Sequence, residues 1–183
     1  FQRGNWQRAK LFLEAPAEVS LIGVTGQGTL EERGAWWLFL RYLRGQTGSD
    51  TFMTTLTQTT LSGIDNVEAS MGRDWPTLLS DWSAALELER QLAERVGLTV
   101  RDELQFLDID LLQTLEVGAG GFPLQPVVND TGDFSVTGRL WSSSAAHFLL
   151  ITGDGGLATS LAGPLGGPAA PEAVMRLEVV RLF

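Results

Sequence analysis

The spacing of apolar residues changes near Gly97, and this change constrains the fold more than any other feature of the chain. Before Gly97, apolar side chains recur every three or four residues, which is typical of amphipathic helices. After it, glycine-rich breaks separate short segments of β-branched or alternating character. We therefore predict an α+β protein with a helical domain over residues 1–96. A small antiparallel, β-rich, sandwich-like domain is expected over residues 97–183.

The most clearly marked helix begins after Thr29. Thr29 and Glu32 have the spacing of a capping box, in which each residue bonds the other's backbone N–H. This helix is expected to run to about Arg44 and to stop at Gly45. Its apolar face comprises Trp36, Phe39, Leu40 and Leu43.

Further helix starts are indicated after Ser49, Asn66 and Asp74. The first of these helices includes Phe52, and the last continues to about Val96. In the second half, residues 117–123 are expected to break any helix. Strands are predicted over 134–140, 146–152 and 175–182, with a hairpin turn over 153–156.

The composition excludes several classes of function. The 183 residues contain one histidine and no cysteine. This composition excludes disulfides, thiolate metal sites and a two-histidine zinc helix. The formal net charge of -9 argues against binding nucleic acid. No apolar run reaches the roughly 18 residues of a membrane-spanning helix, so we expect a soluble or membrane-extrinsic protein. Because the chain begins at Phe1 with no leader, we expect a processed product or a fragment.

Three segments offer polar groups that could bind an ion or a substrate. The loop over 23–28 precedes a capped helix, but Glu31 and Glu32 would repel a phosphate, so we predict a structural turn. Residues 108–110 and 129–133 carry oxygen ligands of the kind that calcium prefers. They lack the EF-hand spacing, so solvated acidic turns are predicted. A calcium- or carbohydrate-binding β module remains as an alternative.

Three serines, 142–144, lie close in sequence to His147. The G-x-S-x-G elbow of a hydrolase is absent, and neighbours along a strand point to opposite faces. We therefore interpret His147 as a packed or surface histidine. No catalytic residue, cofactor or metal ligand is predicted.

A stripe of arginine and tryptophan along the first marked helix is the more distinctive candidate. Arg33, Trp37, Arg41 and Arg44 recur at i, i+4, i+8 and i+11, so they share one helix face. Arginine and tryptophan are enriched among the anchors of protein interfaces, and arginine also pairs with lipid phosphates. These four residues, called the stripe below, are the predicted partner-binding site. The alternative is a solvated face on which arginine stems cover the indole.

Three segments resemble part of a known family: 33–43 (RGAWWLFLRYL), 60–72 (TLSGIDNVEASMG) and 75–82 (WPTLLSDW). Together, residues 33–90 resemble the helical region downstream of the active site in hyicolysin-like (gluzincin) bacterial zinc metallopeptidases. The resemblance implies a shared scaffold. It carries over no functional residue, because the chain contains no H-E-x-x-H zinc motif.

These observations lead to two hypotheses of function. The first is a non-catalytic, membrane-extrinsic interaction subunit that stabilises a larger bacterial assembly at the periplasmic side of a membrane. Its partners would be protein subunits, with lipid headgroups as a second contact. One specific candidate is an accessory polypeptide of a photosynthetic reaction centre and light-harvesting complex. The alternative is a C-terminal fragment of a secreted zinc metallopeptidase whose catalytic half is missing.

Overall fold

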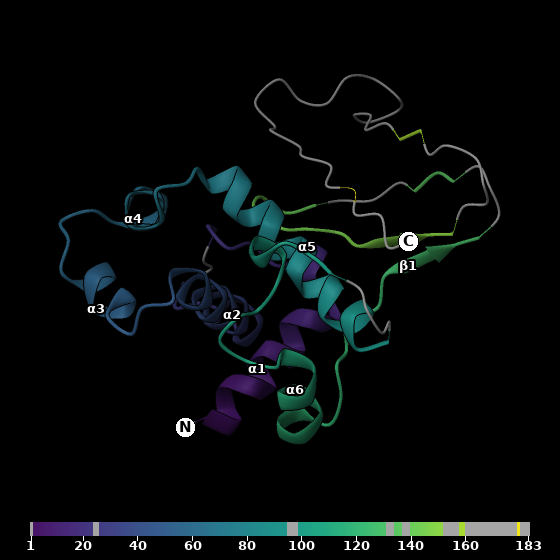
Figure 1. The fold of residues 1–183 in the computed structure, drawn as a ribbon. Helices are drawn as coiled ribbons and strands as arrows, with labels where there is room; N and C mark the ends of the chain where they lie inside the picture. Colours follow the sequence, from purple (N-terminus) through teal and green to yellow (C-terminus); the bar gives the residue numbers. More distant parts are fainter. Residues whose placement is uncertain are drawn as a thin grey trace.

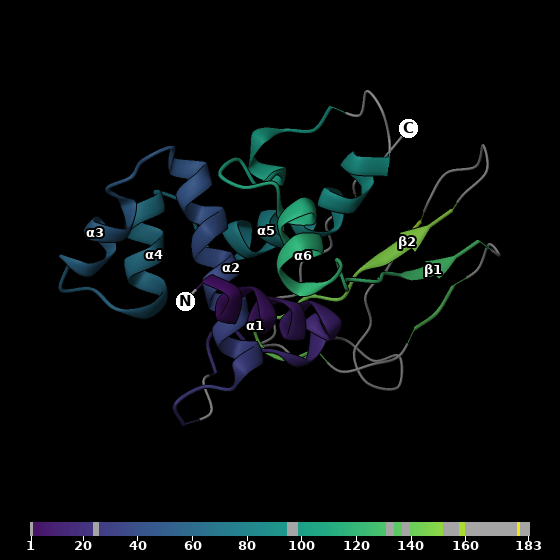
Figure 2. The same cartoon turned by 90° about the horizontal axis from the view of Figure 1, so that it is seen from below.

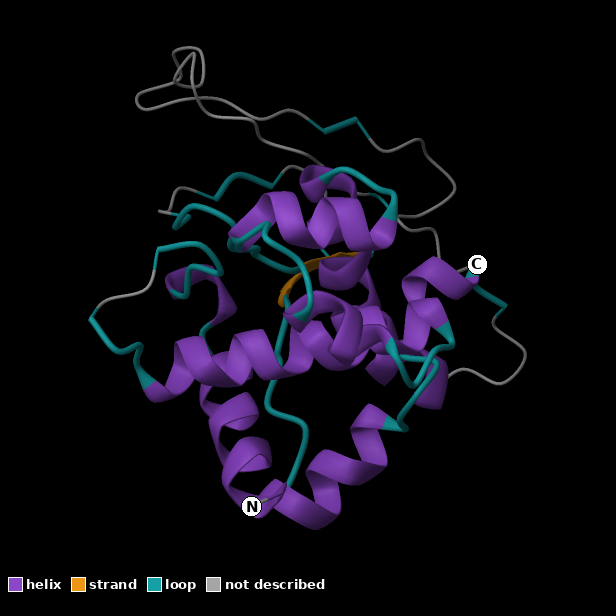
Figure 3. Ribbon diagram, turned by 90° about the vertical axis from the view of Figure 1, so that its left-hand side faces the viewer, coloured by secondary structure: helices purple, strands orange, loops and turns teal. Residues whose placement is uncertain are grey.

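The computed structural model describes residues 2–23, 26–94, 99–130, 134–136, 140–151, 158–159 and 179. Helices account for most of these residues (Figure 3). The α-helices in the described ranges are α1 (Gln2–Glu14), α2 (Leu30–Thr47), α3 (Phe52–Thr57), α4 (Gly63–Met71), α5 (Trp75–Glu94) and α6 (Leu111–Ala119). Two short 3-10 helices, η1 (Pro16–Glu18) and η2 (Asp102–Leu104), and two strands, β1 (Val127–Asn129) and β2 (Phe148–Leu150), complete the described elements.

The helices α1, α2, α5 and α6 gather around one core (Figure 1). The short helices α3 and α4 lie on one side of this group, and β1 and β2 lie side by side on the other (Figure 2). Phe39 of α2 is at the centre of the core, with its ring edge-on to Trp75 at 5.3 Å and to Trp82 at 5.2 Å. Phe12 of α1 stacks on the same Trp82 at 5.5 Å. Aromatic packing therefore joins α1, α2 and α5.

The predicted capping box at Thr29 is confirmed, because Glu32 N donates to Thr29 Oγ1 and Thr29 N donates to the Glu32 carboxylate. The helix continues one turn further than expected. Gly45 is buried inside α2, and the left-handed residue that ends the helix is Gly48, with φ of 58°. The predicted stop at Gly45 is therefore wrong, and the helix ends at the next glycine in the sequence.

The other helix starts are partly confirmed. The helix after Ser49 is α3, and Asp74 caps α5 by accepting from Thr77 N at 3.0 Å. The prediction for Asn66 is wrong, because Asn66 lies inside α4 and the N-cap position belongs to Ser62. Asn66 instead donates to Leu56 O and thereby ties α4 to α3.

The predicted antiparallel, β-rich, sandwich-like second half is wrong. The described part of that half contains a helix, α6, and only two three-residue strands, which pair in parallel with Val127 opposite Phe148. The helix forms because Leu111, Leu115 and Ala119 recur every four residues and are buried against the core. It ends at Gly120, which is left-handed.

The three strands predicted for this half have different outcomes. The segment 146–152 contains β2, but residues 134–136 and 140 of the segment 134–140 are not in a strand. Phe134 nevertheless packs edge-on against Phe148 at 5.7 Å. The expected hairpin turn over 153–156 and, apart from Val179, the strand over 175–182 lie outside the described residues.

A tight turn at 141–144 fastens the second half to the helices. Ser20 Oγ donates to Ser142 O at 2.7 Å, and Trp75 Nε1 donates to Ser143 Oγ at 3.0 Å. Ser144 Oγ donates to Ala17 O at 3.1 Å. The three serines therefore serve as hydrogen-bonding groups that hold this turn against the segment after α1 and the start of α5.

The backbones of α1 and α2 approach each other closely at Gly34. A β-carbon at this position would lie only 2.1 Å from the carbonyl oxygen of Arg8 in α1. The neighbouring Ala9 and Ala35 are fully buried. Only glycine at position 34 therefore allows the α1 backbone to rest directly on α2.

We predict that Gly34→Ala lowers the free energy of unfolding by about 3 kcal/mol, because the added methyl group would meet backbone atoms that cannot move independently. Gly4→Ala is the matched control, since Gly4 lies in α1 with open space around it. This control should stabilise the protein by up to about 1 kcal/mol through helix propensity. Urea denaturation measures both effects, and equal free energies for the two variants would contradict the close crossing.

Candidate functional site

The structure divides the stripe into two halves with different surroundings. At its C-terminal half, Arg41 Nη2 bonds Asp108 Oδ1 at 2.9 Å, and Arg44 Nη1 bonds Asp108 Oδ2 at 3.4 Å. Arg44 also pairs with Asp50. The side chain of Asp108 is only 15% exposed, whereas that of Asp50 is 90% exposed. Asp108 is therefore the partner that matters for these arginines.

The loop that carries Asp108 lies directly against α2. A β-carbon at Gly45 would be 3.2 Å from Asp108 N and 3.3 Å from Leu107 N, so the absence of a side chain there leaves space for the loop. Gln46 Nε2 of α2 donates to Gln105 O at 2.9 Å and strengthens the same contact. The C-terminal half of the stripe is thus partly covered by the chain itself, and the side chains of Arg41 and Arg44 are 28% and 34% exposed.

The N-terminal half of the stripe lines an open groove of about 420 Å³ between α1 and α2. The groove is bounded at one end by the loop at residues 27–28, and its other lining residues include Arg8, Glu32, Arg33, Trp36, Trp37 and Leu40. Arg33 and Trp37 were predicted as partner-binding residues, and the structure brings Arg8 from α1 and Trp36 from α2 beside them.

The two arginines of the groove bond only to neutral groups in the described part of the chain. Arg33 Nη2 donates to Gln27 O at 3.0 Å, and Arg8 Nη1 donates to Asn5 Oδ1 at 3.2 Å. The carboxylate of Glu32, which also lines the groove, accepts from Thr29 N at 2.7 Å. The groove is therefore lined by two positive charges and one negative charge, which leaves a net charge of +1, and its carboxylate is bonded to the helix cap.

The two indoles that line the groove pack against other aromatic side chains. Trp37 packs edge-on against Trp6 with ring centroids 4.3 Å apart, and Trp6 in turn lies against Gly118 of α6. Trp36 packs edge-on against Phe39 at 6.1 Å. Both indoles are half-buried, so they offer apolar surface whose orientation is already fixed.

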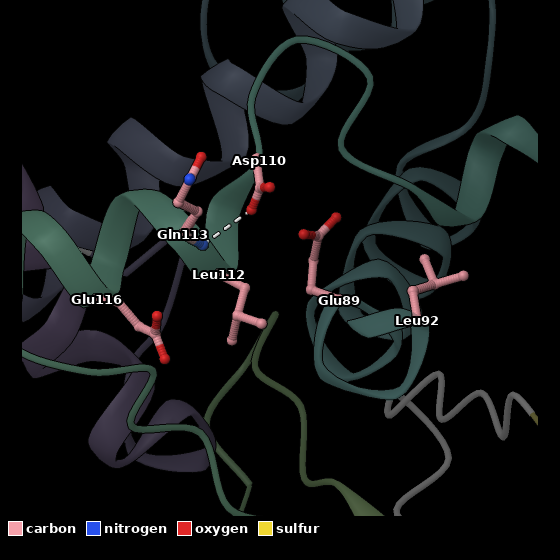
Figure 4. Close-up of a pocket in the computed structure, with 6 residues that line it drawn as sticks. All are labelled: Glu89, Leu92, Asp110, Leu112, Gln113 and Glu116. Carbon is pink, nitrogen blue, oxygen red and sulfur yellow. Dashed lines mark hydrogen bonds between the residues drawn. The ribbon is translucent and has the colours of Figure 1, made fainter. Parts of the chain in front are cut away.

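A second hollow of about 350 Å³ lies between α5 and α6 (Figure 4). Glu89 of α5 points into it, and its Oε1 accepts from Phe106 N at 3.3 Å. Burial, together with the negative charge of Asp110, raises the pKa of Glu89 to about 7. Asp110 itself caps α6 by accepting from Gln113 N at 2.8 Å. Glu89 thus holds the loop before α6 against α5, whereas Asp110 stabilises the start of α6 itself.

The other candidates from the sequence occupy structural positions. The ring of His147 is desolvated, its Nε2 has no hydrogen-bond partner, and burial lowers its pKa to about 4. In the acidic segment 108–110, Asp108 forms the ion pairs with Arg41 and Arg44, and Asp110 caps α6. Among the described residues, no three acidic or histidine side chains are grouped closely enough to hold a metal ion. Residues 24–25 and 131–133 lie outside the description.

No protein family, curated protein or solved structure matches the chain in the comparisons with known proteins. The resemblance to hyicolysin-like metallopeptidases therefore stays a prediction. No helix in the described ranges has the length and apolar character needed to cross a membrane.

We predict that Asp108→Asn lowers the free energy of unfolding by about 2 kcal/mol, because it removes the shielded charge that pairs with Arg41 and Arg44. Asp50→Asn is the matched control, since Asp50 also pairs with Arg44 but is exposed. This control should have no measurable effect on urea denaturation. An equal loss in both variants would show that burial of Asp108 is unimportant.

The raised pKa of Glu89 predicts a pH-dependent stability. Between its ordinary pKa of 4.5 and about 7, the unfolded chain loses a proton that the folded protein keeps, so Glu89 destabilises the fold as pH rises through this window. His147, whose pKa is lowered, acts in the opposite direction between about 4 and 6.5. The useful quantity is therefore the difference in unfolding free energy between Glu89→Gln and the unchanged protein at each pH.

The free energy of unfolding of Glu89→Gln, taken relative to that of the unchanged protein, should rise by up to about 3 kcal/mol between pH 4.5 and 8. Glu116→Gln removes a carboxylate that lines the same hollow but is exposed, and it should leave the effect of Glu89 in place. A difference for Glu89→Gln that stays constant with pH would refute the assignment.

Proposed function

We propose that the protein is a non-catalytic interaction subunit of a larger bacterial assembly, located at the periplasmic side of a membrane, and that it binds its partner through the groove between α1 and α2. The observation that carries this proposal is the division of the stripe. Arg41 and Arg44 are paired within the chain, while Arg33 and Trp37 line an open groove together with Arg8.

The physical properties of the groove favour an interface. Arginine and tryptophan are the residues that most often contribute large binding energies at protein interfaces. The indoles of Trp36 and Trp37 are held by Phe39 and Trp6, so little side-chain entropy would be lost on binding. The groove shares no lining residue with the second hollow, whose acidic residues come from α5, α6 and the loop before α6.

A non-catalytic role is supported by the contacts of the polar groups that could otherwise do chemistry. The hydroxyl of Ser143 accepts from Trp75, that of Ser144 donates to the segment after α1, and Asp110 caps a helix. Asp108 is held between two arginines. These groups contribute to folding, and each is bonded to a fixed neighbour.

The second candidate function is a C-terminal fragment of a secreted zinc metallopeptidase. One observation favours it: the three segments that carry the resemblance pack into one unit. Phe39 of the first segment, Val67 of the second and Trp75 of the third all belong to the same buried cluster. The gene upstream of Phe1 distinguishes the candidates. A leader peptide supports the interaction subunit, whereas an H-E-x-x-H helix supports the metallopeptidase.

Gentle purification from the native membrane fraction, followed by mass spectrometry, tests the interaction proposal. The unchanged protein should retain partner subunits at constant stoichiometry, and the double variant Arg8→Gln/Arg33→Gln should lose them. The matched control is Thr54→Glu/Thr60→Glu, which changes the net charge equally on the exposed surface of α3 and the following loop. Retention of the partners by the arginine variant, or their loss from both variants, would contradict the proposal.

A further inference from the structure

We infer that the open half of the stripe binds an acidic peptide segment of the partner, in which a carboxylate is flanked by apolar side chains. This inference rests on the proposed function, since it takes the groove between α1 and α2 as the partner-binding site. It adds the chemistry of the partner segment, which the covered half of the same helix face indicates.

The chain itself provides an example of such a segment bound to the stripe. The carboxylate of Asp108 lies between Arg41 and Arg44, and the backbone of the loop rests on Gly45. The residues on either side of Asp108 are apolar, and Ile109 packs against the core. One half of the stripe thus already binds an aspartate through two guanidinium groups, with the following isoleucine packed against the core and the preceding leucine exposed.

The open half presents the same combination of groups. Arg33 lies on the same face of α2 about two turns before Arg41, and Arg8 of α1 takes the place of the second arginine. Trp36, Trp37 and Leu40 supply the apolar surface. The covered and open halves therefore form one continuous face, with a ligand from within the chain on the first half.

Charge complementarity specifies an acidic occupant. Neither Arg8 nor Arg33 forms an ion pair within the described ranges, and the Glu32 carboxylate is bonded to Thr29 N. A carboxylate entering the groove would meet two guanidinium groups that can each form bidentate hydrogen bonds. A basic segment would be repelled by both. The apolar neighbours of the carboxylate would then pack on the indoles, whose positions are already fixed.

The test uses the full 183-residue chain, labelled with nitrogen-15, and a blocked peptide with the sequence of residues 104–110 (LQFLDID). We expect this peptide to shift the NMR signals of the Trp37 indole and of backbone amides 33–37. A peptide with both aspartates replaced by asparagine should bind at least about tenfold more weakly. Binding of the acidic peptide should also weaken as salt is added, because the contact is partly electrostatic.

Two variants of equal net charge localise the binding. Arg33→Gln should raise the dissociation constant of the acidic peptide about tenfold, whereas Thr60→Glu should leave it unchanged. Arg33 is exposed and bonds only Gln27 O among the described groups, so its replacement should not disturb the fold. Equal binding of the two peptides, equal binding to the two variants, or shifts confined to residues 41–45 would each overturn the inference.

Other occupants of the groove give distinct results. Sedimentation with phosphatidylglycerol vesicles that is lost in Arg33→Gln, without peptide binding, would assign the groove to lipid headgroups and overturn the inference. A dimer that dissociates in Arg33→Gln, without peptide binding, would assign it to a second copy of the chain and overturn it as well. If the peptide fails to bind but Arg8→Gln/Arg33→Gln still loses its native partner subunits, the interaction function stands and the acidic segment alone is refuted.

Discussion

The backbone contact between α1 and α2 at Gly34 is the constraint on which the rest of the structure depends. Because position 34 has no side chain, the carbonyl of Arg8 can lie where a β-carbon would otherwise be. This close crossing places Trp6 on Trp37 and brings Arg8 to the same groove as Arg33. It also positions α6, since Gly118 packs on Trp6 and Lys10 donates to Ala119 O. The core and the candidate site thus both depend on the backbone contact at Gly34.

The same helix face that forms the groove also organises the second half of the chain. Asp108 covers Arg41 and Arg44, and the loop before α6 is held to α5 by Glu89. The Asp108 carboxylate has little exposure to water, so losing its partners is costly. The stripe therefore has two roles along its length: its C-terminal half stabilises the fold, and its N-terminal half is available to a ligand.

Local signals in the sequence predicted the local features well. The capping box at Thr29, the cap at Asp74 and the helix after Ser49 each depend on a few neighbouring residues, and each is present. The β-rich second half was wrong in part because residues 117–123 were expected to break any helix, whereas α6 continues through Gly118 to Ala119. Inside α6, the space beside Gly118 is filled by Trp6 of α1, which is distant in sequence. The division into domains at residues 96 and 97 stays a prediction.

The candidate site was also predicted only in part, because some of its contacts join residues that are distant in sequence. Helical spacing identified the stripe, because Arg33, Trp37, Arg41 and Arg44 are close in sequence. It could not show that Asp108 covers two of the four, nor that Arg8 joins the others, since both contacts depend on tertiary packing. The available signal was the small residues on both helices, Ala9 in α1 and Gly34 and Ala35 in α2, because small residues permit a close crossing.

The central claim is that this crossing creates a groove for a carboxylate beside apolar side chains. Intermolecular nuclear Overhauser effects between the full chain and the bound LQFLDID peptide test it most directly. We expect contacts from the peptide leucine and isoleucine methyl groups to the indoles of Trp36 and Trp37, with the signals of Asp108 unchanged. Contacts to residues 41–45 together with displacement of Asp108 would instead contradict the account.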